Sequence, residues 1–331
     1  MSGRPTLRIS VVGATGALGR EVISVLDERH VAIAELLPIA TDRSLGTVID
    51  FQGDSVPVYT EAHDLGDFTF LCAPPDVCRE YVRTALERRV PAFDLSGALA
   101  DVAEVPLVVT DLGTPPAALS GPVVASAAGS ALAWALVLAP LERAAGLCRV
   151  VGTVLEAVSG HGLRGIESLH DETVALLSQR EMPDPSVFPG PVAFDCLPRV
   201  GGVDPDGHTG RERALARDVR RLLGENLRVA ASVLQVPTFT GDGTLLAVET
   251  ERELPLSDAL AAFEKAPGVA LVEGDFGPTT RSTAGSAEVL IGRMRSDPSS
   301  PRGLLLWIVA DTLRLAAANA VKLAETRFRA N

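Results

Sequence analysis

Three glycines near the start of the chain have the spacing of a dinucleotide-binding turn. Gly13, Gly16 and Gly19 follow an apolar run over residues 7–12 and precede a helical pattern over residues 20–29. Glycines so placed let the backbone turn tightly, approach a pyrophosphate closely and pack the helix against the strand. The alternative is a strand–helix turn that binds nothing. The residues predicted to contact a cofactor here are Gly13, Ala14, Thr15, Gly16, Ala17 and Leu18.

A second group of candidate cofactor residues, Arg43 and Ser44, follows the next apolar segment, residues 31–39, and is preceded by Asp42. In a Rossmann-type fold, this position meets the adenine ribose. An acidic side chain there suits a 2′-hydroxyl, and an arginine suits a 2′-phosphate. Arg43 and Ser44 therefore favour NADP, whereas Asp42 is a contrary signal. The alternative is a solvated surface turn, because charged side chains are mostly exposed.

A turn of small residues at 126–130 lies between an apolar run and a long apolar helical segment, residues 131–145. Reactive side chains and anions are often held at such a turn, because unpaired N–H groups and the helix dipole point outward there. This turn has no cysteine. Ser130 is its best candidate nucleophile, but serine is also a common helix N-cap, and we favour that interpretation.

Glu156, His161 and Asp242 could form an acid–base cluster or a weak metal site. We favour the simpler interpretation that His161 is a rim histidine, because no other residues complete a ligand set. The four cysteines lie in or beside apolar runs, which suits buried thiols in a reducing compartment. Cys148 is accordingly expected in the core. No metal is expected.

The elements that position these residues divide the chain in two. Over the first 125 residues, short apolar strands alternate with helices, which predicts an α/β, Rossmann-type, doubly wound parallel sheet. Longer strands after residue 126 predict an α+β domain on a more antiparallel sheet. The helical pattern near the C-terminus predicts a helix that returns to the first domain. The predicted domains are 1–125 with about 304–331, and 126–303.

Within these domains, Asp76 is expected to cap a helix over residues 77–88. Further helices are predicted over residues 166–179 and 211–224. The strands predicted for the second domain are 149–158, 226–236, 245–250 and 287–291.

Composition excludes several classes of function. The 331 residues carry a formal net charge of −12, which argues against nucleic acid and anionic membrane surfaces as partners. No apolar run reaches the roughly 18 residues needed to span a bilayer. The N-terminal segment lacks the apolar core of a signal peptide, so a cytoplasmic location is expected. The chain is 47% hydrophobic and 4% aromatic, which predicts a core of Ala, Val and Leu.

Eight segments, in order, resemble aspartate-semialdehyde dehydrogenases over essentially the whole chain. They are GATGALG (13–19), TDRS (41–44), VPLVV (105–109), VSGHG (158–162), AFDCLP (193–198), VPTFTGDG (236–243), GRMRSD (292–297) and ADTLRLAAANAV (310–321). The resemblance implies a homodimer that uses NADPH to reduce aspartyl phosphate to the semialdehyde. It also implies covalent catalysis by a cysteine thiolate, with a histidine to move protons, a glutamine to orient the carbonyl, and Arg and Lys to bind anions.

Three positions that should carry this chemistry hold other residues. Gly129 stands where the resemblance implies the nucleophilic cysteine, Glu156 where it implies the glutamine, and Asp242 where it implies the histidine. No cation remains at the matching anion-binding positions. Gln235 and Ala100 replace arginines and Ala214 replaces a lysine, the last two on a looser correspondence.

These losses are typical of a Usg-like branch that keeps the fold and loses the site. The chain is therefore predicted not to catalyse the family reaction and to act by binding a dinucleotide, another small molecule or an active paralogue. NADP is left open, because Pro74 and Pro75 stand where the resemblance implies a glycine pair near the cofactor. The alternative is an NADP-dependent oxidoreductase of different chemistry, with Glu156 or Asp242 as the base.

Overall fold

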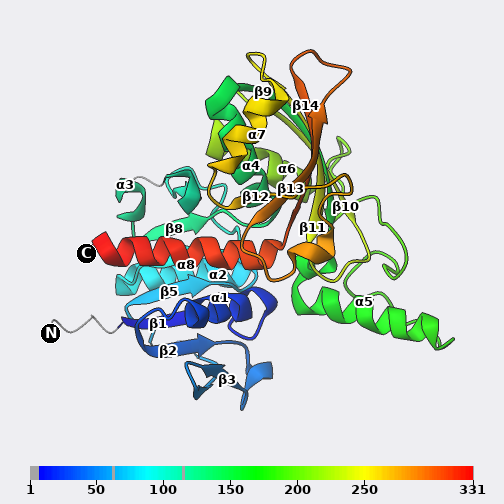
Figure 1. The fold of residues 1–331 in the computed structure, drawn as a ribbon. Coiled ribbons are helices and arrows are strands. Elements are labelled where there is room, and N and C mark those ends of the chain that lie inside the picture. The colour runs from blue at the N-terminus through cyan, green and yellow to red at the C-terminus, as the bar shows by residue number, and fades with distance from the viewer. Residues whose placement is uncertain (1–6, 62–63, 114–115, 331) are drawn as a thin grey trace. The chain divides into compact units, whose positions relative to one another are not determined.

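The computed structural model describes residues 7–61, 64–113 and 116–330, which form two compact units. The first contains the chain up to Ala128 and again from Ala316 onward, and the second contains Gly129–Leu315. Figure 1 labels their helices and strands. The first unit is built on a parallel sheet and the second on a mixed sheet, as the sequence predicts.

The first unit has the strand order of a doubly wound α/β fold. Its strands, in sheet order, are β2 (Ile33–Ile39), β1 (Leu7–Val12), β5 (Phe68–Leu71), β6 (Ala92–Asp94), β8 (Val123–Ser126) and β7 (Leu107–Val108). All strand pairs of this six-stranded sheet are parallel, whereas β3 (Val48–Phe51) and β4 (Asp54–Pro57) form a separate antiparallel pair. Because β2 lies on one side of β1 and β5 on the other, the strand order reverses at β1. Ligands bind such folds at the carboxyl ends of the strands beside this reversal.

The core of the first unit depends on a few aromatic side chains. Phe68, Phe70 and Phe93 are fully buried, and the rings of Phe68 and Phe93 meet edge to face at 4.5 Å between centroids. Phe328 adds a fourth ring, 5.3 Å from that of Phe68. The remaining core is largely Val, Leu, Ile and Ala, as the composition predicts.

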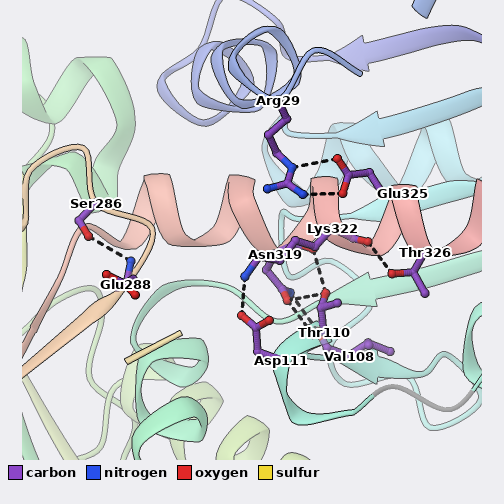
Figure 2. Close-up of polar contacts among 10 residues, drawn as sticks. All are labelled: Arg29, Val108, Thr110, Asp111, Ser286, Glu288, Asn319, Lys322, Glu325 and Thr326. Carbon is purple, nitrogen blue, oxygen red and sulfur yellow. Dashed lines mark hydrogen bonds and ion pairs between the residues drawn. The ribbon is translucent and has the colours of Figure 1, made fainter. Parts of the chain in front are cut away.

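The C-terminal helix α8 (Thr312–Ala330) is tied to the first unit by polar contacts (Figure 2). Asn319 is buried; its Oδ1 accepts the Thr110 N–H at 2.8 Å, and its Nδ2 donates to the Val108 carbonyl at 3.2 Å. Lys322 forms an ion pair with Asp111 at 2.6 Å. These contacts confirm that the C-terminal helix returns to the first domain.

The other elements of the first unit are α1 (Ala17–Glu28), η1 (Asp42–Ser44), β3 (Val48–Phe51), β4 (Asp54–Pro57), α2 (Pro75–Arg88), η2 (Thr110–Leu112) and α3 (Pro116–Leu119). The prediction that Asp76 caps α2 is wrong. Pro74 is the N-cap residue and no side chain caps the helix, because the ring of Pro75 already fixes the first helical residue.

The second unit is a six-stranded mixed sheet with helices on one face. Its strands, in sheet order, are β10 (Arg228–Gln235), β9 (Leu147–Glu156), β11 (Asp242–Thr250), β14 (Gly303–Ala310), β13 (Val289–Ser296) and β12 (Val269–Leu271). Strands β9 and β10 are parallel, whereas β11 is antiparallel to β9 and β14. Its helical elements are α4 (Gly129–Ala145), η3 (Val158–His161), α5 (Gly162–Leu177), α6 (Gly210–Leu223), α7 (Leu256–Glu264) and η4 (Thr280–Thr283).

The apolar helix α4 packs against this sheet through Trp134. A side chain at Gly152 of β9 would meet the Trp134 ring at 2.2 Å, so glycine makes room for the indole. The indole nitrogen lies 3.4 Å from the Thr244 hydroxyl of β11. The other face of the sheet presents Leu245 and Trp307 to an open groove of about 540 Å³.

The predicted domain boundary near residue 304 is too early. Residues Gly303–Ala310 pair with β11 and β13 in the sheet of the second unit. Leu304, Leu306 and Ile308 are buried, which is the alternation of a strand. Among the described residues, no helix is long and apolar enough to span a membrane.

Candidate functional site

The glycine turn after β1 has the geometry that a dinucleotide requires. Gly13 has φ +83°, and a Cβ there would lie 2.8 Å from the Ala73 nitrogen. A Cβ at Gly19 would lie 2.2 Å from the Gly13 carbonyl oxygen. The N–H groups of Gly13 and Ala14 both donate to the Ile39 carbonyl, which fixes the turn beside the end of β2. The first turn of α1 then presents unpaired N–H groups, the donors that hold a pyrophosphate.

The second predicted group of cofactor residues lies beside this turn. The hydroxyl oxygens of Thr15 and Ser44 lie 3.0 Å apart, within hydrogen-bond distance, so the glycine turn and η1 are in contact. Arg43 lies next to Ser44 and is exposed. Pro75 begins a helix after β5, and the chain between them touches Gly13 through Ala73. The described residues therefore fit a dinucleotide at the reversal point of the sheet.

The turn that should carry a nucleophile presents none. Helix α4 starts at Gly129, whose φ is +56°, and a Cβ there would meet no atom within 4 Å. The prediction that Ser130 caps α4 is wrong, because Ser130 is already inside the helix. Its hydroxyl instead lies 3.5 Å from Oδ2 of Asp242, at the upper limit of a hydrogen bond.

Glu156, at the end of β9, forms an ion pair that sequence reasoning missed. It is 5% exposed, and its Oε1 lies 3.0 Å from Nη2 of Arg211. Arg211 lies in the first turn of α6, between the two residues of a capping box, Thr209 and Glu212. The Thr-x-x-Glu pattern of that box was a sequence signal for the helix start. The identity of the partner, however, depends on tertiary structure.

Gln235 lies beside Glu156 in the parallel register of β9 and β10. It is 1% exposed, and its amide nitrogen donates to the Glu156 carbonyl oxygen at 2.7 Å. That bond fixes the orientation of the amide and leaves Oε1 as a buried acceptor. Within the described chain, Oε1 makes no hydrogen bond of normal geometry.

Asp242, at the start of β11, is a buried carboxyl group with a perturbed pKa. It is 6% exposed; burial, and next the charge of Glu156, raise its pKa to about 7. Its Oδ1 accepts the Ala157 N–H at 2.9 Å, and Oδ2 lies 3.3 Å from the Thr312 hydroxyl. Such a group exchanges its proton near neutral pH.

His161 lies beside Glu156 with its side chain 25% exposed, which is compatible with the rim position expected from the sequence. Its ring meets Phe188 edge to face at 4.8 Å between centroids, and Nε2 lies 4.0 Å from Oε1 of Glu156. Burial lowers the pKa of His161 and favours the neutral ring. The described residues contain no group of three His, Cys, Asp or Glu side chains placed to hold a metal ion.

The other residues singled out from the sequence do not add a reactive or charged group to this cluster. Cys148 is half-buried near the start of β9, about 26 Å along the strand from Glu156, so it does not replace the missing thiol. Ala214 follows Arg211 by three residues in α6 and carries no charge. Ala100 is buried in the first unit. Glu156, His161, Gln235 and Asp242 are thus brought together in the second unit, with Arg211 added.

Comparison with known proteins identifies the relatives of this chain. Residues 8–118 match the NAD-binding domain of semialdehyde dehydrogenases, and residues 138–315 match their dimerisation domain. An aspartate-semialdehyde dehydrogenase of Aquifex aeolicus is 32% identical, with 96% of this chain and 97% of the relative aligned. A USG-1 protein homologue of Azotobacter vinelandii is 35% identical, with 97% of each chain aligned.

A solved structure gives the same result. The crystal structure of aspartate-semialdehyde dehydrogenase II from Vibrio cholerae matches with a TM-score of 0.93 at 29% identity, covering 98% of this chain and 99% of that one. Sequence and fold agree over both units, and the family models match the parallel-sheet unit and the mixed-sheet unit separately. The chain therefore belongs to the semialdehyde dehydrogenase family.

Proposed function

We propose that this protein no longer catalyses the covalent family reaction and acts by binding. The observation that carries the proposal is the absence of a nucleophile at Gly129, beside a cluster with two buried carboxyl groups, Glu156 and Asp242. Loss of a covalent nucleophile typically costs about a millionfold in rate. Like charges at close range also disfavour a polyanionic acyl phosphate.

Arg211 changes one part of the sequence argument. The cluster keeps a cation, so it is not purely acidic, but Glu156 already neutralises it at 3.0 Å. One paired guanidinium does not offer an acyl phosphate the several free cations that its charge requires. The proposal therefore rests on the missing nucleophile together with an internally paired charge.

The experiment is a rate measurement on the purified protein. We expect no NADPH-dependent reduction of aspartyl phosphate, and no phosphate-dependent oxidation of the semialdehyde, above the rate without protein. An active relative assayed in parallel serves as the positive control. Protein-dependent turnover in either direction would overturn the proposal.

The bound dinucleotide proposed here is NADP. The turn at Gly13 and the Thr15–Ser44 contact support a dinucleotide, and the exposed Arg43 supports a 2′-phosphate. Solved relatives include a Candida albicans aspartate-semialdehyde dehydrogenase crystallised with NADP. Calorimetric titration with NADP and with NAD tests this part, and we expect tighter binding of NADP.

A homodimer is the second part of the proposal. The mixed-sheet unit matches a dimerisation domain. Leu245 is 51% exposed on the sheet face opposite α4, where it lines the open groove with Leu155 and Trp307. Apolar side chains gathered on one sheet face are typical of a protein–protein contact. Partners such as an active paralogue would use the same surface.

One observation favours a different chemistry as the second candidate function. Asp242 has a pKa of about 7, which suits a general base. Hydride transfer to NADP with Asp242 as the base would need no thiolate. This candidate requires NADP binding, so the absence of binding at millimolar NADP and NADPH would eliminate it.

A further inference from the structure

The guanidinium of Arg211 is held by one of its three nitrogens. Nη2 donates to Oε1 of Glu156 at 3.0 Å and to the Gly160 carbonyl at 3.4 Å. Nε and Nη1 make no hydrogen bond to any described residue. The Arg211 side chain is 46% exposed, whereas that of Glu156 is 6% exposed. One edge of the guanidinium is therefore fixed to the protein and the opposite edge is open.

Glycine at position 160 is part of this arrangement. A Cβ at Gly160 would lie 2.5 Å from Oε1 of Glu156, so only glycine lets the carboxylate lie against the backbone there. The same residue offers its carbonyl oxygen to Arg211. Because two acceptors already hold Nη2, much of the conformational entropy of ordering the side chain is lost before any ligand binds. A preorganised guanidinium edge is the group that grips a carboxylate with two parallel hydrogen bonds.

Two further buried polar atoms of the cluster, Oε1 of Gln235 and Nε2 of His161, make no hydrogen bond of normal geometry within the described chain. The side chain of Gln235 is nevertheless near enough to His161 to raise the pKa of the imidazole. Nε2 of His161 lies 4.0 Å from the same Glu156 oxygen that Arg211 contacts. A buried polar atom without a hydrogen-bond partner lowers the stability of the folded protein. Such atoms are concentrated where a ligand or ordered water binds. Open space adjoins the cluster at Gly162, where a Cβ would meet no atom within 4 Å.

We propose that the open edge of Arg211 is a carboxylate-binding subsite of this cluster, with Glu156 and Gly160 as the residues that position it. The inference rests on the proposed function, because it assigns a ligand class to the same cluster. The charges nearby define that class further. Glu156 contacts Arg211 at 3.0 Å, and Arg211 is near enough to Asp242 to lower the pKa of that carboxyl group. An anion on the open edge of Arg211 would therefore meet two carboxyl groups, so we expect a single carboxylate to be accepted and a phosphate dianion to be repelled.

The test is a thermal stability titration without cofactor or substrate. Sodium acetate is exchanged for sodium chloride at constant ionic strength, and sodium phosphate is used in a second series. We expect acetate to raise the unfolding midpoint by about 2 °C at 200 mM, as a saturable effect of binding to the native state. Phosphate at the same ionic strength should do no more than chloride.

Variants assign the effect to Arg211. R211A should abolish the acetate shift, and R211K should reduce it at least threefold, because an ammonium group cannot present two parallel donors. R213A is the matched control: Arg213 is two residues further along α6 and pairs with Asp204 and Asp206 on the surface, so its loss should leave the shift unchanged. G160A tests positioning, because displacing Glu156 should weaken the acetate effect while Arg211 is still present.

The outcomes separate this inference from the proposed function. An acetate effect equal to that of chloride in the wild-type protein, or one that survives R211A, overturns the subsite. If R211A does not fold, the comparison of wild type, R211K and R213A by line broadening of the acetate methyl resonance decides the same question. Acyl-phosphate turnover would overturn the proposed function and would leave the acetate result standing.

Discussion

At the scale of single residues, Asp242 makes the stability of the second unit depend on pH. Its pKa is raised from 3.8 to about 7 in the folded protein by burial and by Glu156. Between these values the native state holds a proton that the unfolded chain releases. Stability from this group is therefore fully present below about pH 4 and is lost as pH rises toward 7.

Replacing Asp242 by asparagine removes this dependence. In D242N, the free energy of unfolding relative to wild type should increase between pH 5 and pH 7.5 by on the order of 2 kcal/mol, because each pKa unit corresponds to about 1.4 kcal/mol. Urea unfolding at several pH values measures it. D204N, at an exposed carboxylate paired with Arg213, is the control and should keep the wild-type slope. Parallel slopes for D242N and wild type would contradict the assignment.

Gly13 tests the cofactor turn at the same scale. G13A places a Cβ 2.8 Å from the Ala73 nitrogen at φ +83°, so we expect a loss of about 2 kcal/mol in unfolding free energy and at least tenfold weaker NADP binding. G53A is the matched control. Gly53 has φ +89° but a Cβ there meets no atom within 4 Å, so it reports the backbone strain without the clash. Equal NADP affinity in wild type and G13A would refute the turn as the phosphate site.

At this scale, the geometry of a local turn could be predicted from the sequence, whereas contacts between distant segments could not. The glycine turn follows from three residues within seven positions, and the structure gives each of them a steric reason. The Arg211–Glu156 pair joins positions 55 residues apart, through the end of β9 and the first turn of α6. No local pattern specifies that contact. The partial burial of His161 likewise depends on a residue distant in sequence, Phe188.

At the scale of elements, α8 shows how a helix is fixed by one buried polar residue. Asn319 pairs with Thr110 and Val108 and also donates to the Ser126 hydroxyl at 2.9 Å (Figure 2 shows the first two of these partners). The backbone groups of Val108 and Thr110 belong to β7 and η2, whereas Ser126 ends β8. Because β7 is the edge strand, the Asn319 side chain satisfies backbone groups that a further strand would otherwise satisfy.

Truncating Asn319 should therefore cost far more than breaking a nearby ion pair. N319A leaves several buried partners unsatisfied, and we expect a loss of about 2–3 kcal/mol in unfolding free energy. K322A breaks the Lys322–Asp111 pair, whose side chains are 30% and 21% exposed, and should cost less than about 1 kcal/mol. Chemical denaturation of both variants measures the difference. Similar losses would show that the hydrogen bonds of Asn319 are not the main tie.

Most elements could be predicted from the sequence because their apolar periods are clear. The strand over Gly303–Ala310 is the instructive exception. Its apolar run continues almost directly into the helical pattern of α8, so the local sequence does not say which sheet it joins. The partner strands β11 and β13 decide that, and they are distant in sequence. Ser130 was misassigned for a smaller reason, because Gly129 with φ +56° already begins α4.

At the scale of the whole molecule, the mixed sheet is expected to make the contact between two copies. Leu245 lies opposite Trp307 across β11 and β14, beside the open groove. Acidic side chains at Leu245 would have to be desolvated in a dimer, which is costly.

L245E should therefore weaken the dimer at least tenfold in dissociation constant. Light scattering with size-exclusion chromatography should give about twice 34.6 kDa for the wild type and a concentration-dependent lower mass for the variant. L177E is the control, because Leu177 is 73% exposed at the end of α5 and does not line the groove. A stable dimer of L245E would exclude this face as the interface.

The ion pair between Lys322 and Asp111 has a practical consequence. The chain contains only two lysines, Lys265 and Lys322, against many arginines. Lys265 is exposed at the end of α7, whereas Lys322 donates to Asp111 at 2.6 Å. An amine-specific reagent consequently has one fast side-chain target and one protected target. The extent of modification at Lys322 relative to Lys265, measured by mass spectrometry, therefore reports how often α8 detaches and exposes Lys322.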